Sequence, residues 1–120
     1  MKKISLFILL CFLIAGPLFA DKSSTKIEAP DKAAKGSVVT IKITVTHNGN
    51  NIFHHTNWVY VKIDNKEVAR WEYTATKLPE DEVFVKEIKY KIEKTVTIEA
   101  EANCNLHGSK GKSVKKIEVQ

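Results

Sequence analysis

The feature that most constrains the fold is a strict alternation of apolar and polar residues between positions 37 and 46. Val39, Ile41, Ile43 and Val45 alternate with threonine and lysine, and a period of two places all four apolar side chains on one face of a β-strand. A strand with one apolar face is stable only when a second layer covers that face. The chain must therefore build a sheet that packs against another layer.

Segments of the same kind recur about every ten residues and are separated by turn residues. We expect a short edge strand at 26–30, ended by Pro30, and then a charged turn over residues 31–36. No segment after residue 20 shows the period of a helix. Further strands are expected at residues 58–63, 67–76, 82–90, 95–102 and 113–119.

About seven short strands predict an all-β fold, an immunoglobulin-like antiparallel β-sandwich. The cysteine-tryptophan-cysteine spacing of antibody domains is absent, so this likeness is one of architecture. Aromatic residues with the period of a strand usually fill the core of a sandwich. We expect that position for Trp58, Trp71, Phe84 and Tyr90.

The first twenty residues have the pattern of a secretory signal peptide. Lys2 and Lys3 precede an apolar run over residues 4–15, and residues 18–20 end in a small residue. We expect residues 1–20 to be removed on export to the periplasm and residues 21–120 to form one domain. No later run reaches the ~18 apolar residues of a membrane span.

The net charge of the expected mature chain gives only a weak indication of its ligand. Without Lys2 and Lys3 the formal net charge falls from +5 to +3, and the lysines are spread along the strands. This pattern does not indicate nucleic acid and weakly favours a small anion. Cys11 also leaves with the signal, so Cys104 is an intermolecular link, a buried bystander or a working thiolate.

Cys104 and His107 lie three residues apart in a tight turn, from which a thiolate and an imidazole can reach one metal ion. The other histidines, His47, His54 and His55, share one polar loop. Loops collect at the two ends of a sandwich, so we expect this loop and the turn to meet. Imidazoles with one thiolate suit iron, copper or zinc and do not suit calcium or magnesium.

These residues resemble the iron-binding domain of the desulfoferrodoxins and neelaredoxins, the superoxide reductases. The specific part is the Cys-Asn-Leu-His-Gly turn at 104–108, and His47, the pair His54-His55 followed by Trp58, and the segment 27–30 support it. The resemblance covers nearly all of the mature chain. It implies a mononuclear non-haem site that cycles between Fe2+ and Fe3+ and reduces superoxide to hydrogen peroxide.

The resemblance also implies a role for each ligand. Cys104 would be the axial ligand, and His47, His54 and His107 would be equatorial ligands. His55 follows His54 on an extended segment, so its side chain should point the other way. The position opposite the sulfur would be open to superoxide.

The sequence departs from the family pattern near the start of the mature chain. By the same resemblance, Ser23 stands where the family has a fourth equatorial histidine, and Lys22 is the cation that would attract superoxide. A serine cannot replace an imidazole, so the alternatives are that water or His55 fills the position, that the site holds a different metal, or that the protein is no longer a reductase. No rubredoxin-like domain precedes this segment, so we expect a separate small electron-donor protein, and an oligomer stays open.

Two other function classes fit parts of the pattern. An electron-transfer copper protein of the cupredoxin kind also combines a β-sandwich with histidines and a cysteine. Its usual axial methionine is missing, since Met1 is the only methionine. The other class is a non-catalytic exported module that binds metal, or that binds a partner through a sheet edge.

Overall fold

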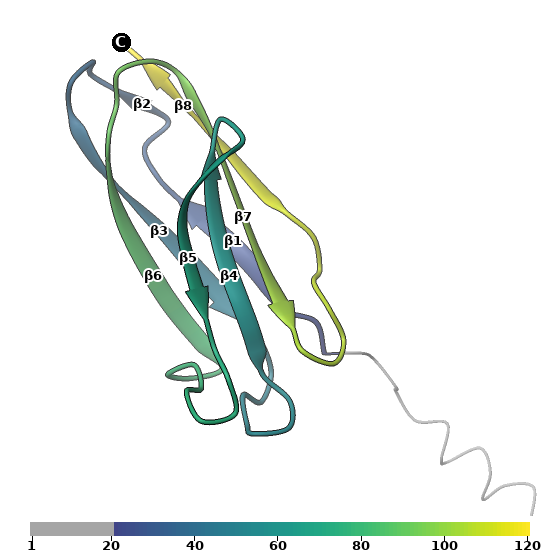
Figure 1. Cartoon of the computed structure of the whole chain (residues 1–120). Coiled ribbons are helices and arrows are strands. Elements are labelled where there is room, and N and C mark those ends of the chain that lie inside the picture. Colours follow the sequence, from purple (N-terminus) through teal and green to yellow (C-terminus); the bar gives the residue numbers. More distant parts are fainter. Residues whose placement is uncertain (1–20) are drawn as a thin grey trace, which may run out of the picture.

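The structure is a computed structural model that describes residues 21–120, and Figure 1 shows these residues as strands joined by loops. The expected signal peptide lies outside the described residues. Within residues 21–120, no helix is long and apolar enough to cross a membrane. The strands are β1 Ser24–Glu28, β2 Lys32–Ala33, β3 Val38–Thr46, β4 Thr56–Ile63, β5 Lys66–Glu72, β6 Val83–Lys91, β7 Val96–Cys104 and β8 Ser113–Val119.

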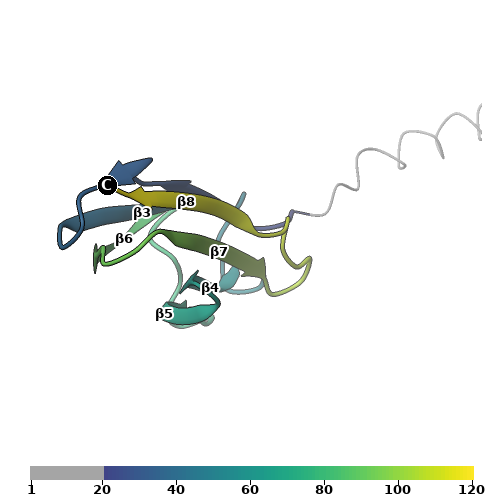
Figure 2. The ribbon, with the colours of Figure 1, turned by 90° about the horizontal axis from the view of Figure 1, so that it is seen from above.

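The strands form two sheets that pack face to face (Figures 1 and 2). The smaller sheet has the order β1-β3-β6, and the larger sheet has the order β2-β8-β7-β4-β5. Every strand pair is antiparallel except β2 with β8. The predicted antiparallel β-sandwich is therefore confirmed.

The core lies between the sheets and is built from the alternation seen in the sequence. The four apolar residues of the central strand β3 face inward, and none is more than 7% exposed. Burying a valine or isoleucine side chain stabilises a fold by about 1.5–3 kcal/mol, so this core holds the two sheets together. The inward residues of β7 are Val96, Ile98, Ala100 and Ala102.

Several strands differ from the sequence expectation: β1 and β4 begin two residues earlier than expected, and β5 ends at Glu72 instead of residue 76. β2 lies inside the segment expected to be a charged turn, where it pairs with β8 through Glu118 N–H to Asp31 C=O (2.9 Å) and Gln120 N–H to Ala33 C=O (2.9 Å). Two residues are too few to show a period, so this pairing depends on tertiary contacts. β7 runs to Cys104 instead of ending at residue 102, because its backbone continues to pair with the start of β4.

One expectation about the aromatic residues is wrong. Phe84 is buried, and Trp71 and Tyr90 pack against the core from partly buried positions. Trp58 lies instead on the outer face of the larger sheet, stacked on Tyr60 with 5.6 Å between ring centroids. Trp58 and Tyr60 are two residues apart on β4 and therefore share one face of the strand. The inner face of β4 carries its valines and Ile63.

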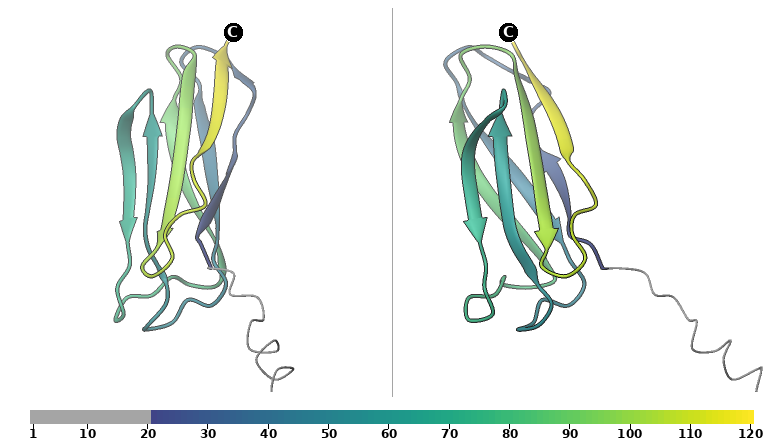
Figure 3. Two further views of the ribbon diagram at one scale, coloured as in Figure 1. Left: turned by 90° about the vertical axis from the view of Figure 1, so that its right-hand side faces the viewer. Right: turned by 45° about the vertical axis from the view of Figure 1, so that its right-hand side comes forward.

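The segments that carry the histidines and Cys104 lie at one end of the sandwich, opposite the C-terminus (Figure 3). They are the β3–β4 connection and the turn after β7, and residues 21–23, which precede β1, lie at the same end. A bulge in β4, between Thr56 and Trp58, accompanies this arrangement. Because the bulge changes the phase of the strand, buried Thr56 is not on the outer face that Trp58 shares with Tyr60.

Candidate metal site

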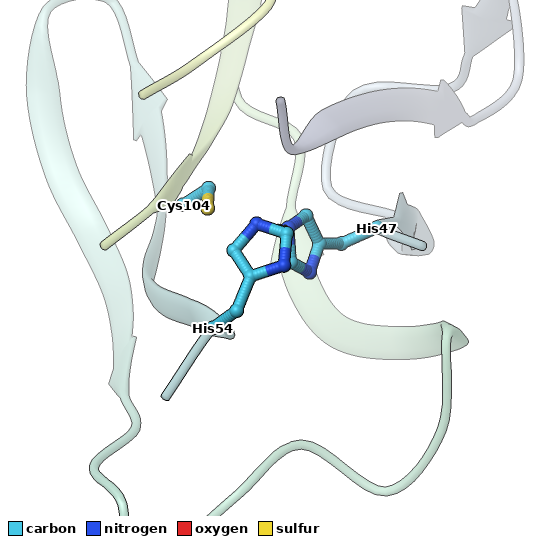
Figure 4. A group of neighbouring side chains, drawn as sticks. All are labelled: His47, His54 and Cys104. Carbon is cyan, nitrogen blue, oxygen red and sulfur yellow. Dashed lines mark hydrogen bonds between the residues drawn. The ribbon is translucent and has the colours of Figure 1, made fainter. Parts of the chain in front are cut away.

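Three imidazoles and one thiol converge at this end of the sandwich. One ligand atom each from His47, His54 and Cys104 lie within 4.8 Å of one another, and Figure 4 shows the three side chains turned toward a common centre. His107 joins them, with Nδ1 3.0 Å from Nε2 of His54 and 3.9 Å from Sγ of Cys104. The loop and the turn meet, as the sequence predicts.

His47 is placed by the end of β3. Its backbone N–H donates to Glu82 C=O at 2.8 Å, so the chain is held against the segment before β6 just after the strand ends. The imidazole is 1% exposed, and its Nε2 lies 3.2 Å from Nε2 of His54. Its other ring nitrogen, Nδ1, lies 2.8 Å from Oδ1 of Asn50.

His54 is placed by a turn that Asn51 closes. Oδ1 of Asn51 accepts hydrogen bonds from the backbone N–H groups of Phe53 (2.9 Å) and His54 (3.0 Å), a local pattern that asparagine favours in turns. The turn leaves Ile52 and Phe53 exposed, at 54% and 77%. His54 itself is half-buried and points into the group (Figure 4).

Cys104 and His107 are held by a hairpin-like turn. The backbone groups of Cys104 and Gly108 exchange two hydrogen bonds, N–H to C=O at 2.8 Å and 3.0 Å. Gly108 has φ +84°, a left-handed conformation that glycine adopts without strain. The turn buries Cys104 to 1% exposure while His107 stays exposed above it.

The surroundings favour the neutral, metal-binding form of His54. Burial lowers the pKa of His54 below its ordinary value, and the neighbouring His47 and His107 lower this pKa further by charge repulsion. A neutral imidazole keeps a lone pair for a metal, whereas a protonated one does not.

The donor set fits a transition metal. Metal–nitrogen and metal–sulfur bonds of about 2.0–2.3 Å place two ligand atoms up to about 4.4 Å apart, close to the spread of these atoms. Imidazole nitrogens with a thiolate are the ligands that iron, zinc and copper accept. His47, His54, Cys104 and His107 could therefore hold one such ion.

His55 does not join this group. Its Nδ1 lies 3.0 Å from the carbonyl oxygen of Asn51, and its backbone is bound on both sides by Asn105 at 3.0 Å. The side chain is only 6% exposed. It is packed beside the metal-binding group and bonded elsewhere, which is the orientation expected of it.

Ser23 lies beside the cysteine turn and is fully buried. Its backbone binds that turn on both sides, through Gly108 C=O (3.3 Å) and Lys110 N–H (2.8 Å). Its hydroxyl is 2.8 Å from the hydroxyl of Thr56, so a hydroxyl pair occupies this position. Lys22, the residue before it, is exposed, and its role toward an anion stays a prediction.

Sequence reasoning did not identify the asparagines that organise the site. Asn50, Asn51 and Asn105 hold the loop and the turn through side-chain hydrogen bonds. The one sign of them in the sequence is composition, because the loop and the turn contain five asparagines near the candidate ligands. Asn51 bonds within its own loop, whereas Asn50 also bonds Asp81 and Asn105 bonds His55, partners that only the folded chain brings within reach.

Comparisons with known proteins agree with this geometry. A family model described as desulfoferrodoxin matches residues 18–111. A superoxide reductase (neelaredoxin) from Ignicoccus hospitalis has the same fold, with 22% identity, a TM-score of 0.70, and coverage of 88% of this chain and 89% of that chain. A candidate superoxide reductase from Thermotoga maritima has 28% identity and a TM-score of 0.61, with coverage of 81% and 86%.

More distant structures share the sandwich alone. The CARDB domain of a Pyrococcus furiosus protein, in complex with di-metal ions, has 14% identity and a TM-score of 0.64, with coverage of 86% and 97%. A comparison with curated proteins gives no match.

Proposed function

The chain belongs to the desulfoferrodoxin family, and we propose that it is an exported non-haem iron protein that reduces superoxide to hydrogen peroxide. The observation that carries the proposal is the convergence of three imidazoles with the buried thiol of Cys104. This family binds iron, and the donor set suits that metal. Export is inferred from the first twenty residues.

Iron held by these residues would supply the single electron that superoxide takes up, and two protons would complete hydrogen peroxide. The Cys104 thiolate would be the anionic ligand of this iron, and the imidazoles of His47, His54 and His107 would be its neutral ligands. Exposed Lys22 is the residue proposed to attract the superoxide anion.

Neither Ser23 nor His55 would supply a fourth imidazole in this proposal. Ser23 offers only a hydroxyl, which is already bonded to Thr56. His55 is held by Asn51 and Asn105. These contacts favour water as the further ligand that a bound iron would take.

Each turnover needs one electron from outside the site. We propose that a separate small donor protein delivers it at this end of the sandwich. The exposed side chains of Ile52 and Phe53, at 54% and 77% exposure, directly precede His54 in the chain, so a donor that contacts them comes close to the ligands.

The test is metal analysis of protein purified without oxygen, followed by superoxide consumption measured after a superoxide pulse. We expect one iron per chain and, after mild oxidation, a thiolate-to-iron charge-transfer band. Cys104→Ser should abolish both the band and the consumption while the circular dichroism spectrum is unchanged. Leu106→Ala, an exposed change in the same turn, is the matched control and should keep both.

Three results would contradict the proposal. Undiminished superoxide consumption by Cys104→Ser would exclude the thiolate site. A blue copper spectrum would identify an electron-transfer protein instead. Protein that takes up no transition metal would be a non-catalytic module.

A further inference from the structure

We infer that Asn50 is a positioning residue that fixes the ring tautomer of His47, so that the lone pair of Nε2 faces the other metal ligands. The inference rests on the metal site of the proposed function and does not depend on superoxide being the substrate. Its basis is a set of three hydrogen bonds made by one side-chain amide, which joins three separate segments of the chain.

The amide of Asn50 has well-defined partners. Its Oδ1 lies 2.8 Å from Nδ1 of His47 and 2.9 Å from the backbone nitrogen of Thr56. Its Nδ2 lies 2.8 Å from the carbonyl oxygen of Asp81. The β3–β4 loop, the start of β4 and the segment before β6 therefore meet on one side chain.

The two backbone partners decide which way the amide faces. The Thr56 N–H can only donate, so the atom facing it must be the amide oxygen. The Asp81 carbonyl can only accept, so the atom facing it must be the amide nitrogen. The usual ambiguity between the two ends of an asparagine amide does not arise at Asn50.

This orientation determines where the hydrogen sits on His47. An amide oxygen only accepts, so Nδ1 of His47 must carry the hydrogen of the 2.8 Å bond. A neutral imidazole carries one ring hydrogen, which leaves the lone pair on Nε2. That atom lies 3.2 Å from Nε2 of His54, on the side of the metal-binding group.

Loss of Asn50 would therefore affect the metal as well as the loop. An imidazole without this acceptor can take the other tautomer, in which Nε2 carries the hydrogen and cannot bind metal. Removing the partner that orients a ligating histidine typically costs about 10–100-fold in metal affinity.

Two substitutions separate the role in orienting the ring from a purely structural role. Asn50→Ala removes all three hydrogen bonds. Asn50→Asp keeps an oxygen that accepts from His47 and Thr56 but loses the bond to Asp81. Asn48→Ala is the matched control, because Asn48 is exposed on the same loop.

The first measurement is the tautomer of each histidine in metal-free protein, from two-bond proton–nitrogen NMR spectra of nitrogen-15-labelled protein at pH 8. We expect the Nδ1–H tautomer for His47 in the wild type and in Asn50→Asp, and a shift toward Nε2–H in Asn50→Ala. A wild-type His47 with its hydrogen on Nε2 would overturn the inference, and this result does not require any variant to fold.

The second measurement is affinity for Co2+, followed by its visible absorption bands. We expect Asn50→Ala to bind about 10–100-fold more weakly than the wild type, Asn50→Asp to recover most of the affinity, and Asn48→Ala to match the wild type. Wild-type affinity in a folded Asn50→Ala would overturn the inference. Protein that binds Co2+ as expected but does not consume superoxide would contradict only the proposed function.

Discussion

Asn105 connects the two ligand-bearing segments, and its replacement by alanine should weaken both the fold and the metal site. Its Oδ1 accepts from the backbone N–H of His55 at 3.0 Å, and its Nδ2 donates to the carbonyl of Phe53 at 3.2 Å. Both partners belong to the loop that carries His54. Asn105→Ala removes both bonds but keeps the backbone bond from Asn105 N–H to His55 C=O.

The expected loss follows from the two bonds. A typical intramolecular hydrogen bond contributes about 0.5–1.5 kcal/mol net. The bond to Phe53 lies in an exposed region and belongs at the lower end, whereas His55 is 6% exposed and its N–H would lose a shielded partner. Together they predict a fall of about 1–2 kcal/mol in the free energy of unfolding of the metal-free domain.

The same bonds hold His54 near His107 before metal binds. If that preorganisation is lost, the metal affinity should fall by a similar free energy, which corresponds to about tenfold. Urea denaturation of the metal-free domain measures the first quantity, and Co2+ titration measures the second. Asn105→Asp keeps the acceptor for His55 and should be intermediate in both.

Leu106→Ala is the control for this prediction, because the side chain is exposed in the same turn and such changes usually stay within about 0.5 kcal/mol. Equal urea midpoints and equal Co2+ affinities for Asn105→Ala and Leu106→Ala would contradict this role of Asn105.

Three further predictions concern single side chains. Ser23→His should lower the free energy of unfolding of the metal-free domain by about 1–3 kcal/mol, because a larger ring enters a filled site and the Thr56 hydroxyl loses its partner. Added metal should recover this stability. Unchanged iron affinity would show that position 23 does not face the metal. Burial, with hydrogen bonds to two glutamates of β7, raises the pKa of Tyr60. The folded domain should therefore lose stability as pH rises through the ordinary tyrosine pKa of about 10. Tyr60→Phe should remove this part of the fall in urea midpoint at alkaline pH. The pKa of His54 is lowered in the folded domain, so the unfolded chain binds a proton on this ring more readily. The stability of the metal-free domain should therefore fall as pH drops below about 6.5. His54→Gln should make this dependence of stability on pH weaker, and an unchanged dependence would contradict the stated cause.

Local sequence pattern predicts most of the strands of this fold. The alternation in β3 needs no knowledge of its partners, because side chains of any strand point alternately to its two faces. The same period places Val96 and Ile98 inward on β7. β2 is too short to show a period, and Trp58 lies on a strand with large apolar side chains on both faces. In such cases the local pattern does not tell which face another strand will cover.

The sequence by itself also determined the chemistry available to the site, because residue types carry it: Cys104 and His107 at turn spacing, and His47 and His54 in one loop, offer a thiol and imidazoles, which can bind a transition metal where they meet. Tertiary structure alone decided that they do meet, that His55 turns away, and that Asn50 and Asn105 hold the ligands in place. The physical reason is that these contacts join residues as much as 53 positions apart. Such distances are set by the register of β4 against β7 and of β3 against β6, which no local pattern encodes.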